Sequence, residues 1–503
     1  MLFAFAAFVA AFCTHSQELT INSDAVSWGE DIKLADKNTR YDYLGTIGGE
    51  DYYAFGYYST GTKGHFNKVG FLKVKDGVLI SQTKDYIKIP RGSLVETMVL
   101  KDELCVIYEQ TSKKNKVFEL KIIKIDKNTL KQKTDEVLIS VDLVKKHYHE
   151  VALFHSKDKK NHAAMLMTKD NKSDRMSVHL FYYNSNMKEQ WNNSYSPSQD
   201  VDMTLLNVMP TSDNAIYILS KQEKEKAKEK NRMYNEDETS SSSCIIAKVT
   251  ENNALELTLD GTFPSRQAKM FEIQPNKLFI AFNNSLNFAA VEYDFDKAIC
   301  RSLSGLSHKQ GKQKTYWSID KIIQLDNGNV VTLLTDDYVV IVTERINMSL
   351  KLYRGLFTYY GRNFNILCFD VDKNKLLYDK YISRAVTSEA QFPIGHGRYE
   401  NILLFNDKND VYAVYNAGRE DNDLSNEVFL SSQITLPKQS KKATGNMIKI
   451  DETGDNVTVT SIVPCKELGL IFSPAISFKS SGKTIQINAI SNKTITFGEM
   501  LLP

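Results

Sequence analysis

Eight short apolar runs recur along the chain, and this repeat limits the possible folds more than any other feature of the sequence. Each run is followed by a loop, a second run, a turn rich in Asp and Asn, and a third run. A further apolar run precedes each unit, so every unit holds four strands. The repeated runs are YYAFG from Tyr52, LCVIY from Leu104, AAMLM from Ala163, AIYIL from Ala215, LFIAF from Leu278, VVTLL from Val330, VYAVY from Val411 and TIQIN from Thr484.

Four-stranded units repeated in this way predict a β-propeller, in which sheets packed around an axis bury both faces and leave only short edges. We predict an all-β fold of eight antiparallel blades, or seven if one weak unit is misread; a pair of β-sandwiches is the alternative. The last unit has room for only three strands, PAISFK, TIQIN and TITFGEM. We expect the N-terminal segment ELTINSDAVSW, residues 18–28, to supply the fourth strand and close the ring.

The spacing of the repeat locates three long insertions. Successive first runs begin 52, 59, 52, 63, 52, 81 and 73 residues apart, and the three largest intervals contain residues 221–243, 336–363 and 417–445. Each insertion connects the second and third strands of its blade. Turns alternate between the two ends of an antiparallel sheet, so all three insertions are expected on one face of the disc. Loops of this length in a compact domain are usually functional or disordered, and the polar composition of 221–243 favours disorder.

The insertion at 336–363 is expected to form a long hairpin that stands out of blade six. Val339, Ile341 and Thr343 alternate with their neighbours as in a strand, and a matching apolar series returns through Leu352 and Leu356. Arg and aromatic side chains are typical of binding hot spots. We predict a protein-binding site here, and the alternative is that the aromatic residues pack against the neighbouring blade. The predicted partner-binding residues are Arg345, Lys351, Arg354, Phe357, Tyr359, Tyr360 and Arg362.

The N-terminus predicts export. Residues 2–12 form a short uncharged apolar run that is followed by small residues, so we predict a signal peptide at 1–16 and a single propeller domain at 17–503. A lipid anchor at Cys13 is the alternative. No other run is long enough for a membrane helix, so the mature chain is not expected to span a membrane. Five further cysteines, without a C-x-x-C pair, are expected to be mostly buried free thiols, with one disulfide left open; they are Cys105, Cys244, Cys300, Cys368 and Cys465.

The sequence contains no motif that identifies a reaction. There is no G-x-S-x-G elbow and no Asp box of the sialidase type, so we predict no catalytic residue and no cofactor. The net charge of +2 is spread along the chain and predicts no binding to nucleic acid. Strand alternation would place His147, His149 and His155 on one face, in a unit that also holds His162 and His179. Zinc needs three or four converging ligands, so we expect packed or solvated histidines rather than a metal site.

Four segments share a pattern with proteins of a known group: VVTLLTDDYVV, TYYGRNFNILCFDVDKNKLLYDKYI, ENILLFNDKNDVYAVYN and QELTINSDAVSWGE. On these segments the chain resembles a group of exported propeller-like proteins of Gram-negative Bacteroidetes, and the likeness covers most of the chain at the level of pattern. The sequence departs from the pattern at Asp336-Asp337, where a Glu-Gln pair is usual, and at Leu377-Tyr378, where a Trp is usual. The C-terminus TITFGEMLLP does not resemble a type IX sorting domain, so the resemblance implies a periplasmic protein.

These observations together predict a non-enzymatic interaction scaffold. The expected partner is a protein, and the resemblance points to an outer-membrane complex such as a type IX secretion translocon. The alternative is a carbohydrate-active or other hydrolytic or glycan-binding propeller. That alternative would place acids around the central channel and would use Tyr359 and Tyr360 to stack on sugar rings.

Overall fold

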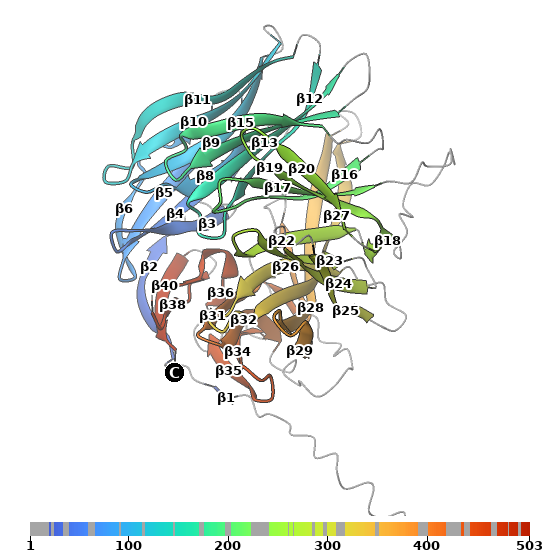
Figure 1. The fold of residues 1–503 in the computed structure, drawn as a ribbon. Helices are drawn as coiled ribbons and strands as arrows, with labels where there is room; N and C mark the ends of the chain where they lie inside the picture. Colours follow the sequence, from blue (N-terminus) through green and yellow to red (C-terminus); the bar gives the residue numbers. More distant parts are fainter. Residues whose placement is uncertain are drawn as a thin grey trace, which may run out of the picture.

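The computed structural model shows an eight-bladed β-propeller (Figure 1). It describes residues 20–502 except 22–24, 34–39, 59–65, 90–91, 113–115, 144–145, 171–175, 197–202, 223–240, 260, 265, 284–286, 295–298, 308–316, 348–351, 391–400, 419–433, 437–442, 464–469, 481 and 491–493. The predicted fold class and the count of eight blades are therefore confirmed. Among the described residues no helix has the length and apolar character that crossing a membrane requires. The predicted signal peptide lies outside the described residues.

Seven blades are sheets of four strands in chain order, and the first strands contact one another around the axis. Blade one contains β3 (Arg40–Ile47), β4 (Glu50–Tyr58), β5 (Phe66–Lys75) and β6 (Val78–Gln82), and blade two contains β8 (Ser93–Val99), β9 (Glu103–Ser112), β10 (Val117–Asp126) and β11 (Gln132–Asp142). Blade three contains β12 (Lys146–His155), β13 (Asn161–Asp170), β14 (Met176–Asn184) and β15 (Glu189–Tyr195), and blade four contains β16 (Met203–Pro210), β17 (Ile216–Gln222), β19 (Cys244–Val249) and β20 (Ala254–Thr258).

Blade five contains β22 (Gln267–Gln274), β23 (Lys277–Asn283), β24 (Asn287–Asp294) and β25 (Ile299–Ser307). Blade six contains β26 (Trp317–Gln324), β27 (Val330–Asn347), β28 (Leu352–Asp370) and β29 (Lys375–Ile382), and blade seven contains β31 (Leu403–Asp407), β32 (Asp410–Gly418), β34 (Ala443–Ile450) and β35 (Val457–Val463). Short additional strands are β7 (Ile87–Lys88), which pairs with β5, and the pair β18 (Ser241–Ser242) and β21 (Phe263–Pro264). Blade six also gains β30 (Val386–Ala390) and β33 (Ile434–Leu436).

Blade eight joins the two ends of the chain. Its first strand is divided into β36 (Ile471–Phe472) and β37 (Phe478–Lys479) around a 3-10 turn at Pro474–Ile476, its second into β38 (Thr484–Gln486) and β39 (Ala489–Ile490), and its third is β40 (Thr494–Leu501). The fourth strand is β2 (Ser27–Lys33), which pairs antiparallel with β40, so the expected closure is confirmed. The closing strand begins later than expected, because β1 (Thr20–Ile21) pairs instead with β35 of blade seven.

The second strands form the centre of the core. In β9, all five residues from Leu104 to Tyr108 are fully buried, because both faces of this strand are covered by neighbouring blades. A strand buried on both faces is a continuous apolar run rather than an alternating one. This explains why the eight runs found in the sequence mark the second strand of each blade.

The first strand of each blade lies nearest the axis and is called the inner strand below. In blades one to six this strand carries a one-residue bulge. The pairing of the first strand with the second skips one residue in each of blades one to six: Leu44, Val95, His149, Leu206, Ile273 and Asp320. A bulge reverses the side-chain alternation beyond it. The bulge at His149 interrupts the regular alternation between His147 and His155, and the side chains of His147 and His149 lie outside the description.

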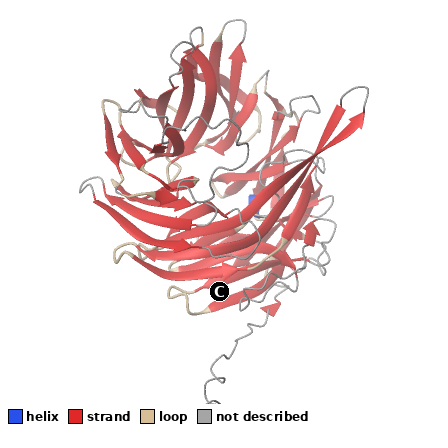
Figure 2. Ribbon diagram, turned by 90° about the vertical axis from the view of Figure 1, so that its right-hand side faces the viewer, coloured by secondary structure: helices blue, strands red, loops and turns tan. Residues whose placement is uncertain are grey.

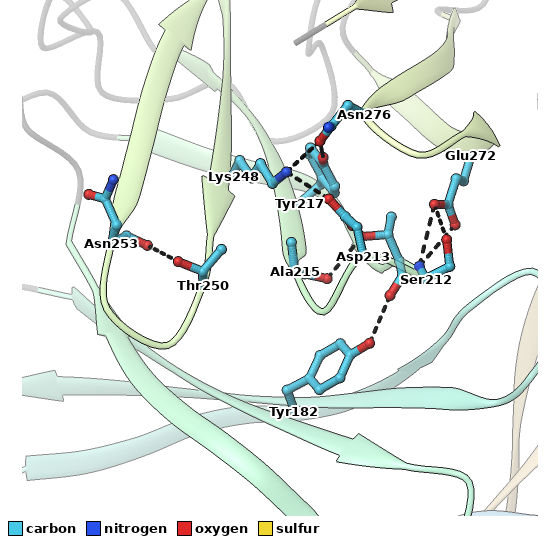
Figure 3. A network of polar contacts seen from close by, with 11 residues as sticks. Tyr182, Ser212, Asp213, Ala215, Tyr217, Lys248, Thr250, Asn253, Glu272 and Asn276 are labelled. Carbon is cyan, nitrogen blue, oxygen red and sulfur yellow. Dashed lines mark hydrogen bonds and ion pairs between the residues drawn. The ribbon is translucent and has the colours of Figure 1, made fainter. Parts of the chain in front are cut away.

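The face of the disc that carries the turns between first and second strands, here called the turn face, is held together by bonds between blades (Figure 3). Lys248 of blade four contacts the Asp213 carboxylate at 2.6 Å and donates to the side-chain oxygen of Asn276 in blade five. Ser212 donates its hydroxyl to Glu272 of blade five at 2.7 Å. Asn276 has a φ of 64°, a left-handed conformation that Asn tolerates well in a tight turn.

The cysteines that the structure describes with their side chains are free and buried. They are Cys105, Cys244 and Cys368, on the second and third strands of their blades. Burial raises the pKa of each thiol, to about 12 for Cys244 and for Cys368. These thiols are therefore structural, as expected. The side chains of Cys300 and Cys465 lie outside the description.

Candidate functional site

The predicted hairpin of blade six is present. Strands β27 and β28 pair with each other along their length, and no other element lies between them. The pairing runs from Val330, opposite Phe369, to Asn347, opposite Leu352. The part beyond Asp337 lies outside the four-stranded pattern of the blade, since β26 pairs with β27 only as far as Asp336. Figure 2 shows these two long strands projecting from the body of the propeller.

Two further strands widen the hairpin near its base. β30 follows β29 along the chain and pairs antiparallel with Phe357–Gly361 of β28. β33 belongs to the insertion of blade seven and pairs parallel with β30, from Val386 opposite Ile434 to Ser388 opposite Leu436. We call the resulting four-stranded sheet the platform; it consists of Asp337–Asn347 of β27, Leu352–Gly361 of β28, β30 and β33. A hairpin alone is only marginally stable in water, and the added strands support it.

The structure places the backbone of most predicted partner-binding residues in the platform. Arg354 lies opposite Glu344, Phe357 opposite Ile341 and Tyr359 opposite Val339. Arg345 lies opposite Tyr353 near the tip, whereas Lys351 and the side chains of Arg345, Arg354, Phe357 and Tyr359 are outside the description. Residues directly opposite each other on paired strands are close enough for their side chains to interact. An acidic residue, Glu344, therefore lies in backbone register with Arg354 among the predicted partner-binding residues.

The remaining two predicted residues lie at the base of the platform. Tyr360 and Arg362 are both half-buried, and the backbone carbonyl of Arg362 accepts a hydrogen bond from Nε of Arg384 at 2.8 Å. Tyr360 lies opposite Tyr338 on β27 and opposite Thr387 on β30. These two positions therefore belong to the junction between the platform and the blade rather than to its tip.

Arg384 anchors this junction, and no motif or pattern in the sequence indicates its role. Its side chain is completely buried, and one guanidinium nitrogen lies 3.4 Å from the Asp337 carboxylate. Its backbone N–H donates to the side-chain oxygen of Asn363 at 3.3 Å, and the guanidinium lies 5.6 Å from the ring centre of Phe364. A buried cation needs such partners, because its desolvation is costly. Arg384 therefore connects β30 to both strands of the hairpin.

A chain of hydrogen bonds joins the inner strands of blades two and three. Nε2 of His155 lies 2.8 Å from Oε1 of Glu96, and Nδ1 of His155 lies 2.8 Å from Nδ1 of His162. A carboxylate only accepts, so His155 donates to Glu96 through Nε2 and accepts from His162 at Nδ1. Burial lowers the pKa of His162 to about 4, which keeps its ring neutral. Within the described part of the chain, no three His, Cys, Asp or Glu side chains are arranged to hold a metal ion.

A recess of about 290 Å³ lies between the inner strands of blades one and two. Its walls include two carboxylates, Asp42 and Glu96, together with Tyr43 and Leu94. Tyr43 stacks on Phe478 of blade eight, with ring centres 3.5 Å apart. The Glu96 carboxylate already accepts the hydrogen bond from His155, so one of the two carboxylates in the recess is bound to another side chain.

The sequence matches no family model and no curated protein. Among solved structures, the Dos1 propeller is 8% identical with a TM-score of 0.40, and the match covers 94% of each chain. The β-propeller domain of the Trilobed protease from Pyrococcus furiosus is 8% identical with a TM-score of 0.33, covering 78% of this chain and 90% of that one. A puromycin-hydrolysing peptidase from Mycobacterium tuberculosis is 9% identical with a TM-score of 0.39, covering 94% of this chain and 61% of the peptidase. This chain thus spans about three fifths of the peptidase's length, and all three likenesses bear on the fold alone.

Proposed function

We propose that this protein is an exported, non-enzymatic scaffold that binds a protein partner through the platform of blade six. The observation that carries the proposal is that three segments far apart in the sequence build one sheet outside the ring. The ring is already closed by the pairing of β2 with β40 and does not need this sheet. Connections that exceed what the fold requires are where propellers and other rigid scaffolds carry binding residues.

The edge of the platform suits the capture of an extended segment. Beyond Asp337, the side of β27 that faces away from β28 pairs with no strand in the described part of the chain. Such an edge presents backbone N–H and C=O groups that can pair with an added strand of a partner. Arg345 and Arg354, on the two strands of the hairpin, would favour a partner segment that carries acidic residues.

The location of the partner rests on the resemblance to exported Bacteroidetes proteins. On that basis we place this chain in the periplasm, beside an outer-membrane complex such as a type IX secretion translocon. Hydrolysis would need carboxylates such as those in the recess between blades one and two, whereas capture of a protein partner would use the platform. Glu96→Gln should therefore leave the capture of the partner unchanged.

The test removes the platform and keeps its anchor. Replacing Val339–Tyr359 by Asn-Gly leaves Asp337, Arg362 and Arg384 in place and joins Tyr338 to Tyr360, which already face each other. The melting temperature should stay within about 3 °C of wild type, because shortening a surface connection changes closure entropy slowly. Partner capture from envelope extract, measured by quantitative mass spectrometry, should be lost.

The control shortens the insertion of blade four, residues 223–240, to a Gly-Ser linker and should keep every partner. Arg354→Ala combined with Tyr359→Ala should reproduce much of the loss, since a few Arg and aromatic residues dominate most interfaces. A platform variant that melts as wild type and still captures the same partners as the control would rule out the proposal.

A further inference from the structure

The recess between blades one and two is open because the second strand of blade one carries small residues there. The hairpins β3–β4 and β31–β32 both turn in two residues, so position 54 of blade one corresponds to position 414 of blade seven, and 56 corresponds to 416. Blade seven has Val414 and Asn416 at these positions, both completely buried, and Asn416 donates to the carbonyl of Phe472 in blade eight at 2.8 Å. Blade one has Ala54 and Gly56, and both line the recess. The space that larger side chains fill in blade seven is therefore available in blade one.

The bulges of two inner strands contribute to the walls. Leu44 and Val95 are the extra residues of the bulges in β3 and β8, and both line the recess. Bulges often redirect side chains next to binding sites. Leu44 is buried with Ala54 and Val69 in the apolar cluster between blades one and two, and Leu94 packs against that cluster. The recess therefore offers an apolar surface to a ligand.

Polar side chains enter the recess from both walls. Tyr41 and Tyr43 pack toward blade eight, so Asp42 between them points the other way, toward blade two. On the opposite wall Met98 packs toward blade three, so the neighbouring Thr97 points toward blade one. Both Asp42 and Thr97 line the recess. A carboxylate and a hydroxyl therefore lie on its two walls.

The charge of the recess is negative. Among the described residues that line it are two acids, Asp42 and Glu96, and no lysine or arginine. Narrow spaces lined by one sign of charge concentrate ions of the opposite sign. Oε1 of Glu96 lies 2.8 Å from Nε2 of His155, so Asp42 is the carboxylate that we assign to a ligand. A carboxylate has about four acceptor positions, and Asp42 can therefore bind a ligand in addition to the contacts that it makes within the protein.

We propose that this recess binds a small organic amine. Asp42 and Thr97 hold its ammonium group, and its apolar part packs against Leu44, Ala54 and Leu94. The volume of about 290 Å³ equals that of roughly ten water molecules in the liquid, which limits the ligand to about ten non-hydrogen atoms. Small-molecule sites commonly combine an apolar lining with a few polar groups that orient the ligand. The site is separate from the platform, and its occupation does not depend on the proposed partner.

Calorimetry with three matched probes, at neutral pH and low ionic strength, tests the proposal. Phenethylamine, phenethyl alcohol and phenylpropionate share an aromatic ring on a short chain and differ in the charge of the end group. Wild type should bind one molecule of phenethylamine, and it should bind the alcohol about tenfold more weakly or worse. It should not bind the acid measurably, because only the ammonium forms a charge-assisted hydrogen bond with Asp42.

Two substitutions separate the charge of the recess from its space. Asp42→Asn keeps the size of the side chain and should weaken the binding of phenethylamine by about tenfold. The matched control is Asp85→Asn, at an exposed acid of the same blade that does not line the recess, and it should bind as wild type. Ala54→Val introduces the residue that blade seven has at this position, and it should weaken the amine and the alcohol alike because the recess loses volume.

Methyl NMR on the wild-type protein gives an answer that does not depend on the folding of a variant. Phenethylamine should shift the methyl signals of Leu44, Ala54, Val69 and Leu94 and should leave those of Val414 unchanged. Equal binding of the three probes, or equal weakening by Asp42→Asn and Asp85→Asn, would overturn the proposal. The absence of phenethylamine binding, or of shifts at the four residues of the recess, would overturn it as well.

Discussion

The turn face and the opposite face of the disc, which carries the insertions, are built by different rules. On the turn face, connections between strands are two to six residues long and are bonded to neighbouring blades, as where Asn327 donates its N–H to Asn409. On the insertion face, the connection between β32 and β34 alone spans 24 residues. Loop-closure entropy rises slowly with length, so the ring tolerates this variation. The comparison shows that the turn face holds the ring together and that the insertion face is available for function.

The bonds on the turn face form a network across blades three, four and five (Figure 3). Tyr182 of blade three donates to the carbonyl of Thr211 in blade four at 2.7 Å, and Ser212 continues the connection to Glu272 in blade five. By contrast, the platform contacts the ring through the junction at Arg384. We therefore expect a change on the turn face to destabilise the whole ring, and a change at the platform to act locally.

The largest expected effect is acid destabilisation through His162, which follows the turn between β12 and β13. Its pKa is about 4 in the folded protein against 6.5 for an unperturbed histidine, because of burial and the neighbouring His155. As pH falls below 6.5, the unfolded chain takes up a proton that the folded protein refuses until pH 4. The free energy of unfolding should fall by roughly 3 kcal/mol across this window and should be regained above it.

Urea unfolding at pH 7.5 and pH 4.5 measures this loss. His162→Asn keeps a donor in the place of Nδ1 but cannot titrate, so its stability should depend much less on pH. His179→Asn, in the same blade, is the control and should retain the wild-type pH dependence. If His162→Asn keeps the wild-type pH dependence, other groups cause the acid destabilisation. Besides His155, the charged residues that act on His162 are Asp158 and Lys159.

The repeat in the sequence predicted the ring because its signals are local. Apolar runs such as LCVIY from Leu104 identify strands buried on both faces, and the Asp and Asn turns identify the hairpins between them. The same alternation predicted the hairpin of β27 and β28. The bulges in the inner strands left no such signal, since they depend on how the blade twists around the axis. The bulge at His149, for example, interrupts the alternation expected from His147 to His155.

The second effect concerns Arg384, at the junction of the platform. Arg384→Ala removes the guanidinium that donates to the carbonyl of Arg362 and contacts the Asp337 carboxylate. The free energy that holds the platform on the blade should fall by about 2 kcal/mol, and most of this loss should appear as local opening of the platform. Hydrogen exchange should show faster exchange of the amides of β28 from Phe357 to Gly361 and of β30. Amides of the second strands should exchange as in wild type.

Lys373→Ala, on the turn face, is the control for this change. Lys373 is exposed and pairs with Asp370 within its own turn, so its replacement should leave hydrogen exchange close to wild type in both regions. If Arg384→Ala increases exchange throughout the ring, the platform is coupled to the core, and the contrast between the two faces is smaller than we infer.

The platform itself marks the limit of prediction from the sequence. The segments that form β30 and β33 are five and three residues long, and they pair with each other across the 43 residues between Ala390 and Ile434. Neither segment is distinguishable from a loop by its own pattern.

The smallest effect, and the sharpest test of the turn face, is Lys248→Met. Methionine keeps the apolar stem beside Tyr217 but removes the ammonium that contacts Asp213 at 2.6 Å and that bonds Asn276 in the next blade. Both members of the ion pair are about one fifth exposed, so water screens them only in part. We expect a loss of about 1 kcal/mol in the free energy of unfolding, shared by the whole ring.

A double-mutant cycle with Asp213→Asn isolates the contribution of the pair. The coupling should be positive and should persist in 1 M salt, since partly buried pairs are screened less than exposed ones. Lys124→Met breaks a pair inside blade two whose Glu136 carboxylate is 46% exposed, against 17% for Asp213, and it should lose more of its effect in the same salt. If the two pairs respond alike to salt, the bonds between blades add no more than surface ion pairs do, and the packing of the second strands alone holds the ring together.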